Sequence, residues 1–195
     1  MHQRLSISQN AAARVMCGAM LLSPLACGPV RADDVATPAA TQTPGPALVL
    51  EPARDGSGRI LPVEHSDAQW RAILSEDAFE VLRRHGTERP FTSPLLEEDR
   101  DGLYACASCG LVLFESDTKF KSGTGWPSFT EPIGDHVSDH VDRSFGMVRT
   151  ENRCARCDGH LGHVFEDGPP PTGLRYCING DALHFVAEDA SIPEG

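Results

Sequence analysis

Two matched cysteine pairs place the strongest constraint on how this chain can fold. Cys106 and Cys109 form one C-x-x-C, and Cys154 and Cys157 form a second. Four thiolates in two such pairs are the donor set of a closed tetrahedral metal site. Residues 110–153 separate the pairs by 44 positions, more than in a compact zinc ribbon. Two separate knuckles must therefore be brought together by the rest of the fold.

Zinc is the metal that this site is predicted to hold, at one structural ion per chain. Four thiolates leave no open coordination position, which indicates a structural role rather than a catalytic one. A glycine follows each pair, Gly110 and Gly159, and is expected to let the backbone turn tightly around the thiolates. A redox dithiol or a pair of disulfides is the competing interpretation. A thioredoxin-like motif, however, occurs singly and opens a helix, whereas strand-like sequence follows Cys109.

Cys177 is left outside both pairs and is the candidate for chemistry. An ordinary thiol with a pKa of about 8.5 is only a few per cent thiolate at neutral pH. Arg175, or protonated His160 and His163, would lower that pKa, and the histidines could also serve as a general acid. The residues alone leave another interpretation open, in which Cys177 is an inert buried side chain and H-x-x-H is a second metal site.

The N-terminus has the pattern of an export signal. Residues 1–32 begin with a basic, acid-free stretch, followed by a short apolar run from Val15 to Cys27. The small residues Val30 and Ala32 then predict cleavage after Ala32. The run is too short to span a bilayer as a helix, so an exported, periplasmic protein is expected. Lipid attachment at Cys27 and a mitochondrial presequence are the alternatives.

Composition divides the remainder into a linker and one domain. Residues 33–62 are rich in Pro, Ala and Thr and are predicted to form a flexible linker, with 47–50 as a possible partner of an edge strand. The folded domain is expected at 63–190. Loss of residues 1–32 removes three arginines and no acids, so 17 basic and 28 acidic residues become 14 and 28, a net charge of −14. Such a charge disfavours nucleic acid and anionic membranes as partners, and no later segment is apolar enough to span a membrane.

The domain is predicted to be mainly β, with helices only at its N-terminal side. Ser66 begins a helical pattern with Gln69 as its capping-box partner, and His85-Gly86 is a suitable end. Ser75, followed by two acids, can restart the pattern, so one helix and two are both compatible with it. The predicted strands, separated by Gly, Pro and Asp, are 111–114, 144–150, 163–165, 174–178 and 183–186.

Four further motifs identify a family. They are Gly-Trp-Pro-Ser-Phe at 125–129, His-Leu-Gly-His-Val-Phe at 160–165, Asp-Gly-Pro at 167–169 and Arg-Tyr-Cys-Ile-Asn at 175–179. Together they resemble the B-type methionine sulfoxide reductases, which reduce the R epimer of methionine sulfoxide. The resemblance covers roughly residues 70 to 185. It implies two antiparallel sheets joined by the zinc site, in a β-sandwich or β-tent, with short peripheral helices.

The resemblance also implies roles for individual residues. Cys177 corresponds to the nucleophile, which attacks the sulfoxide sulfur and becomes a sulfenic acid. His160, His163 and Asn179 correspond to the groups that orient the substrate and protonate its oxygen. Arg175 would help to hold Cys177 as a thiolate.

Trp126 corresponds to the wall that receives the methyl group of the substrate. An indole offers an apolar, polarizable surface on which a sulfur-bound methyl can pack. Taken without the resemblance, Trp126 also fits a simple core anchor.

Two positions depart from the family pattern. Many members carry a resolving cysteine two residues before the tryptophan, where this chain has Thr124. We therefore expect an external small thiol or thioredoxin-like reductant to regenerate Cys177. Gly180 replaces the usual serine after Asn179, which is expected to loosen the turn without abolishing the chemistry.

The expected substrates are oxidised proteins or free methionine sulfoxide, and a monomer is expected. The alternatives from other classes are a non-enzymatic binding module built on a two-sheet zinc domain and a thiol peroxidase. The combination of Cys177, His160, His163 and Asn179 argues against the module. A peroxidase would not need Trp126 or the H-x-x-H pair, His160 and His163, in this order along the chain.

Overall fold

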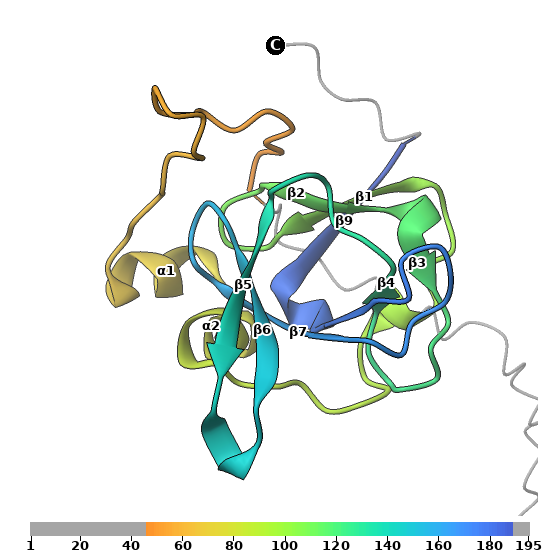
Figure 1. Cartoon of the computed structure of the whole chain (residues 1–195). Helices are drawn as coiled ribbons and strands as arrows, with labels where there is room; N and C mark the ends of the chain where they lie inside the picture. Colours follow the sequence, from red (N-terminus) through yellow and green to blue (C-terminus); the bar gives the residue numbers. More distant parts are fainter. Residues whose placement is uncertain (1–45, 189–195) are drawn as a thin grey trace, which may run out of the picture. The chain divides into compact units, whose positions relative to one another are not determined.

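The computed structural model of the protein describes residues 46–188, which form two antiparallel sheets and two short α-helices (Figure 1). The mainly β fold predicted from the sequence is confirmed. The predicted signal peptide, with Cys27, and the first part of the predicted linker lie outside the described residues. The elements are α1 Asp67–Ile73, α2 Glu76–Arg84, η1 Pro94–Leu96, β1 Gly102–Cys106, β2 Val112–Glu115, η2 Ser116–Thr118, β3 Lys119–Phe120, β4 Ser128–Phe129, β5 Val137–Asp142, η3 Ser144–Gly146, β6 Arg149–Cys154, β7 His160–Phe165, β8 Arg175–Ile178, η4 Gly180–Ala182 and β9 Leu183–Ala187.

The helices form as two units because serine caps both. Ser66 and Gln69 make the predicted capping box at the start of α1. Ser75 accepts a hydrogen bond from the Ala78 amide and starts α2, so the restart is confirmed. His85 ends α2 in the left-handed conformation, with φ at 56°.

One sheet has the strand order β2-β1-β9, and the other has the order β3-β4-β8-β7-β6-β5. Aromatic rings fill the core: Phe114 of the first sheet stacks on Phe129 of the second at 4.3 Å between ring centroids, and Tyr104 meets Phe129 edge-on at 5.0 Å. The strand predicted at 144–150 is displaced, because residues 144–146 form the turn η3 and β6 begins at Arg149. Figure 1 shows η3 at the tip of the long β5–β6 hairpin.

Strand register sets the site residues in one row across the larger sheet. Ser128 on β4 pairs with Cys177 on β8, and Cys177 pairs with His163 on β7. His163 pairs in turn with Glu151 on β6, and Glu151 with His140 on β5. Directly paired residues point to the same face of a sheet. One face therefore carries Cys177 and its polar neighbours.

A β-bulge adds His160 to this face. His160 and His163 are three residues apart, so a regular strand would turn them to opposite faces. Where β6 advances by one residue, from Asn152 to Arg153, β7 advances by two, which makes Leu161 an extra residue. The bulge brings the two imidazole rings to 5.5 Å between centroids.

Several of residues 46–62, which are predicted to belong to a flexible linker, contact the domain. Val49 forms a bridge with Leu111, in keeping with the edge pairing suggested for 47–50. Ile60 is only 4% exposed. Arg54 makes two 2.7 Å hydrogen bonds to the Asp135 carboxylate. These contacts come from a few residues within a Pro- and Ala-rich stretch, and composition alone does not reveal them.

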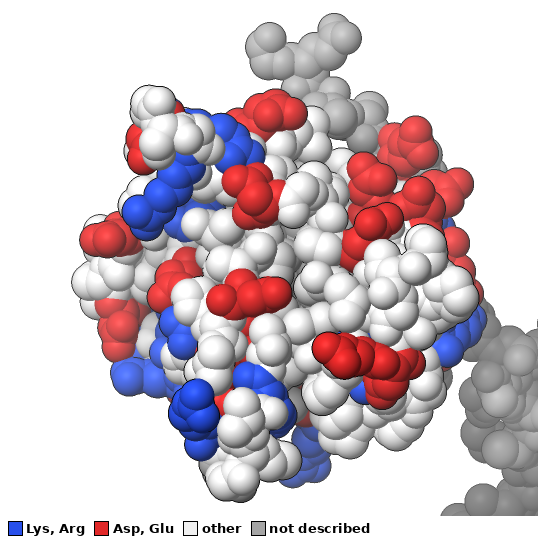
Figure 2. Space-filling view, in the orientation of Figure 1, with Lys and Arg blue, Asp and Glu red and all other residues white. Residues whose placement is uncertain are grey.

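The surface agrees with the acidic composition. Figure 2 shows acidic side chains in several groups across the visible face, with basic side chains mainly at its left and along its lower edge. Within residues 46–188, neither helix has the length and apolar character needed to cross a bilayer.

Candidate active site and metal centre

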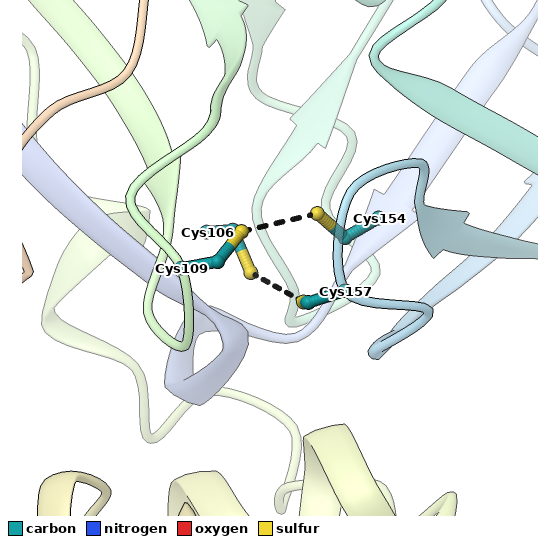
Figure 3. A group of neighbouring side chains, drawn as sticks. All are labelled: Cys106, Cys109, Cys154 and Cys157. Carbon is teal, nitrogen blue, oxygen red and sulfur yellow. Dashed lines mark hydrogen bonds between the residues drawn. The ribbon is translucent and has the colours of Figure 1, made fainter. Parts of the chain in front are cut away.

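The four predicted metal ligands lie together between the sheets. Figure 3 shows Cys106 and Cys109 approaching from one loop, and Cys154 and Cys157 from another. The sulfur atoms are 3.6 Å apart for Cys106 and Cys157 and for Cys109 and Cys154, and all four lie within 4.8 Å of one another. Sulfurs at the corners of a zinc tetrahedron, with bonds of about 2.3 Å, are about 3.8 Å apart. All four cysteines are buried and their spacing fits zinc.

The chemistry of the cluster also fits a cation. Hydrogen bonding among the four thiols raises the pKa of Cys106 and lowers that of Cys157, so part of the cluster favours the thiolate. A divalent cation is what allows four thiolates to share so small a volume.

Two arginines hold the knuckles in place. Arg83 of α2 donates to the Cys157 carbonyl at 2.7 Å and to the Cys157 sulfur at 3.1 Å. Arg156 donates to the Cys109 carbonyl at 2.7 Å, which ties the second knuckle to the first. Such partners fix the orientation of metal ligands.

The two glycines after the pairs have different functions, which corrects the sequence interpretation. Gly110 adopts a left-handed conformation, with φ at 75°, as predicted. In the second knuckle Asp158 takes that conformation, with φ at 55°. Gly159 instead provides space, because a Cβ there would lie 2.9 Å from Leu82 Cδ2.

Cys177 does not belong to the cysteine cluster and instead lines a cavity. The cavity has a volume of about 170 Å³. Trp126, His163 and Asn179 line it with Cys177, whereas His160 and Arg175 lie outside its lining. Trp126 is partly exposed, which fits a cavity wall better than a core anchor. The other described lining residues are Thr87, Arg149, Gly162 and Phe165.

The Cys177 thiol is held mainly in its neutral form. Burial raises its pKa above the usual value. The charge of Arg175 and a hydrogen bond with Thr124 lower the pKa, and Asp167 raises it further. Arg175 acts in the predicted direction, but burial outweighs it.

Arg175 is itself held by the loop after β7. Its guanidinium donates two hydrogen bonds to Asp167, at 2.8 and 2.9 Å, and lies 4.5 Å from the centre of the Phe165 ring. This ion pair limits how much of the positive charge reaches Cys177.

Thr124 faces the thiol. Its hydroxyl oxygen is 4.0 Å from the Cys177 sulfur. The position that the resemblance assigns to a resolving cysteine is thus next to Cys177.

His160 is a neutral, oriented side chain behind the cavity. Burial lowers its pKa, although Glu151 acts in the opposite sense. Its Nδ1 is 2.6 Å from Glu151 Oε1. Burial raises the Glu151 pKa, but hydrogen bonds with Arg153, His160 and His85 outweigh it and bring the pKa to about 2. The ionised carboxylate assigns the proton of His160 to Nδ1.

His163 is oriented by a different carboxylate. Its Nε2 is 2.9 Å from Asp142 Oδ2, and the same oxygen accepts a 2.6 Å hydrogen bond from Arg149 Nη2. Hydrogen bonds from Ser144, and after them from His163 and Arg149, hold the pKa of Asp142 well below its usual range. An anion therefore faces His163 Nε2.

Asn179 holds the backbone that frames the cavity. Its Nδ2 donates to the Leu161 carbonyl at 2.9 Å, and its Oδ1 accepts from the Glu88 amide at 3.1 Å. The Glu88 carboxylate accepts from the Gly180 and Asp181 amides at 2.7 and 2.9 Å. Both polar atoms of the Asn179 amide thus bind main-chain groups, although the resemblance implied a role in orienting substrate.

Comparison with known proteins identifies the domain. Residues 74–187 match the SelR domain. The chain belongs to the SelR domain family. A protein named peptide methionine sulfoxide reductase MsrB in Agrobacterium fabrum is 59% identical over 124 residues, which are 63% of this chain and 92% of that protein. Proteins of the same name are 55% identical over 125 residues in Thiobacillus denitrificans (64% and 95%) and 53% over 128 residues in Methanosarcina mazei (65% and 91%).

Sequence reasoning missed three charged residues in the site of this SelR domain. Asp142 and Glu151 hold the two histidines and Arg149 binds Asp142, but none of the three belongs to a motif that the sequence makes evident. Arg149 and Glu151 are two residues apart, which places them on one face of a strand. Only the register of β6 against β7 reveals that this is the face of His163.

Proposed function

We propose that this SelR domain is a peptide-methionine sulfoxide reductase that acts on the R epimer through Cys177. The observation that carries the proposal is a single thiol, outside the cysteine cluster, on a cavity that it shares with His163 and Trp126. The names of the relatives support the same activity. The indole of Trp126 supplies an apolar wall for the methyl group on the substrate sulfur.

The reaction balances without an external proton. The Cys177 sulfur attacks the sulfoxide sulfur, the S–O bond breaks, and the oxygen moves to Cys177. A thiol and a sulfoxide become a sulfenic acid and a sulfide, and the thiol proton ends on the transferred oxygen. Two equivalents of external thiol then restore Cys177, release water and form one disulfide.

His163 is the candidate that carries this proton. Cys177 starts as a thiol because burial raises its pKa, so its proton must reach the sulfoxide oxygen as the sulfur attacks. His160 suits this less well, since it lies outside the cavity lining and burial lowers its pKa. His163 lines the cavity, and Asp142, 2.9 Å from its Nε2, holds the ring in place. His160 and Asn179 then position the walls of the cavity.

External recycling follows from Thr124. A threonine cannot form the disulfide that a cysteine at this position could form with Cys177. The other four cysteines among residues 46–188 are in the metal cluster. A small thiol or thioredoxin-like protein is therefore the proposed reductant. Mass spectrometry after one turnover without reductant should find sulfenic acid on Cys177, and an intramolecular disulfide there would contradict this step.

The deciding experiment offers each sulfoxide epimer with dithiothreitol to the parent protein and to Cys177→Ser. Turnover of the R epimer alone, lost in the variant, is the expected result. Equal turnover of both epimers, or an active variant, would refute the assignment of Cys177. Complete inactivity of a zinc-loaded, folded parent would favour a binding module.

The proposed metal is one structural zinc ion held by Cys106, Cys109, Cys154 and Cys157. Bound zinc would pin the two knuckles together, and none of the reaction steps passes through it. Elemental analysis of the purified protein should find about one zinc per chain.

Export is a further proposal, which rests on the sequence of residues 1–32. N-terminal sequencing of the protein from a fractionated cell should find cleavage after Ala32, with the mature chain in the periplasm. A lipid on Cys27 or a mitochondrial location would contradict it. The mature chain is proposed to be a monomeric domain over 63–190 preceded by residues 33–62, and light scattering would test the monomer.

A further inference from the structure

A second cluster of metal-binding side chains lies beside the active site. His85 Nδ1 is 2.8 Å from Glu151 Oε1, and His160 Nδ1 is 2.6 Å from the same oxygen. The three atoms lie within 4.8 Å of one another, and the two imidazole rings are 5.4 Å apart between centroids. Among residues 46–188, the zinc cluster and this group are the two sets of side chains arranged in this way.

Three separate elements hold the cluster in place. His85 is the left-handed residue that ends α2, followed by a 2.9 Å hydrogen bond from the Gly86 amide to the Glu80 carbonyl. Glu151 comes from β6, and His160 is the first residue of β7, directly before the bulge at Leu161. The cluster is therefore built by the fold rather than by a mobile loop.

The donor set suits a divalent transition metal. Two imidazole nitrogens and one carboxylate oxygen, with positions left for water, are common ligands for zinc, nickel and copper. Arg153 binds the second oxygen of Glu151 at 2.8 Å and is itself paired with Asp158 at 3.2 Å. Arg153 thus orients the Glu151 carboxylate, and Asp158 offsets the positive charge of Arg153.

The cluster opens to solvent on one side only. The side chain of His85 is 53% exposed, whereas those of Glu151 and His160 are 7% and 3% exposed. Bonds of about 2.0–2.1 Å to a metal need ligand atoms about 3 Å apart, slightly more than the present hydrogen bonds. The exposed His85 ring can supply that movement.

We propose that His85, Glu151 and His160 form a second cation site, for a divalent transition metal, whose occupation slows the reductase. The metal would displace the hydrogen bonds between the imidazoles and Glu151, and would place positive charge beside His163, whose ring is 5.5 Å from that of His160. The site stands on its own geometry, while the inhibitory consequence rests on the proposed function.

Nickel binding tests the site. Calorimetry is performed on the zinc-loaded full chain carrying Cys177→Ser, so that this thiol cannot bind the probe. We expect about one nickel per chain with retention of zinc, and at least 10-fold weaker binding when His85→Asn is added. His65→Asn is the matched control, an exposed histidine that packs on Trp70 outside the cluster, and should bind as the parent does. No saturable binding, or equal affinity in the His85→Asn protein, overturns the site.

Single-turnover kinetics test whether metal at this site slows the reductase. The assay contains no added thiol, because a thiol would remove the nickel. Pre-reduced, zinc-loaded enzyme with Cys177 intact consumes one equivalent of methionine-R-sulfoxide with and without nickel. Nickel should slow this step at least 10-fold in the parent and in His65→Asn, but not in His85→Asn. An unchanged rate at saturating nickel overturns the inhibitory role. A parent that consumes no sulfoxide even without nickel refutes the proposed function, and calorimetry still decides the site.

Discussion

The cysteine cluster and the Cys177 cavity use the same side chain for opposite purposes. Four buried thiols converge in the cluster, each within 4.8 Å of the others. Cys177 meets a hydroxyl, an arginine and a cavity of about 170 Å³ instead. Burial raises the thiol pKa of Cys177, as hydrogen bonding among the thiols does for Cys106. Access and the neighbouring groups, rather than residue type, decide which thiol stabilises the fold and which reacts.

The largest expected effect is the loss of a cluster thiol. Cys106→Ser should abolish zinc binding and cooperative unfolding, because a structural zinc contributes apparent binding energy of about 10–16 kcal/mol against a domain stability of about 5–15 kcal/mol. Elemental analysis and circular dichroism during heating measure both. A folded, metal-free protein would show that the cluster is not needed for folding.

Cys177→Ser should leave zinc binding and stability intact but abolish activity. It is expected to retain one zinc and to unfold within a few degrees of the parent, since the substitution removes no core contact. Turnover of methionine-R-sulfoxide should fall by a factor on the order of 10³ or more, as for a lost nucleophile. A large drop in melting temperature would mean that this thiol also stabilises the fold.

An effect of intermediate size is expected at Gly180, where the resemblance implies a serine. A Cβ on Gly180 would collide with Ser93 Oγ, so Ser93 fills the space that a side chain at 180 would need. Gly180→Ser should therefore cost about 1–3 kcal/mol of unfolding free energy through overpacking. Urea denaturation provides the measurement.

The matched control for Gly180→Ser is a double-mutant cycle. Ser93→Gly alone removes the cap of η1, where Ser93 Oγ accepts from the Leu95 amide at 3.2 Å, and should cost less than about 1 kcal/mol. Combined with Gly180→Ser it should restore most of the lost stability. Strictly additive losses would show that the two sites are not coupled.

Local signals in the sequence were sufficient for the cluster, but not for the side chains that hold the histidines at the cavity. The C-x-x-C pairs and the serine caps depend on neighbours within a few residues, and both were predicted. The face shared by Glu151, His163 and Cys177 depends on the pairing of three strands and on the extra residue Leu161. The contacts of residues 46–62 likewise involve distant partners such as Asp135. A one-residue change in strand register would move Glu151, His163 or Cys177 to the other face of the sheet. The sequence does not encode register locally.

The smallest expected effect is on the titration of Cys177, and it compares the two charges beside the thiol. Thiolate alone reacts with iodoacetamide, so the alkylation rate should rise with pH through the raised pKa of Cys177. Arg175→Met removes an attraction and should move the midpoint to higher pH. Asp167→Asn removes a repulsion and should move it to lower pH. Peptide mass spectrometry follows Cys177 alone, and Arg54→Met, which breaks the distant ion pair with Asp135, should leave the midpoint unchanged. Shifts of Arg175→Met and Asp167→Asn in the same direction would show that cavity shape, rather than charge, controls this thiol.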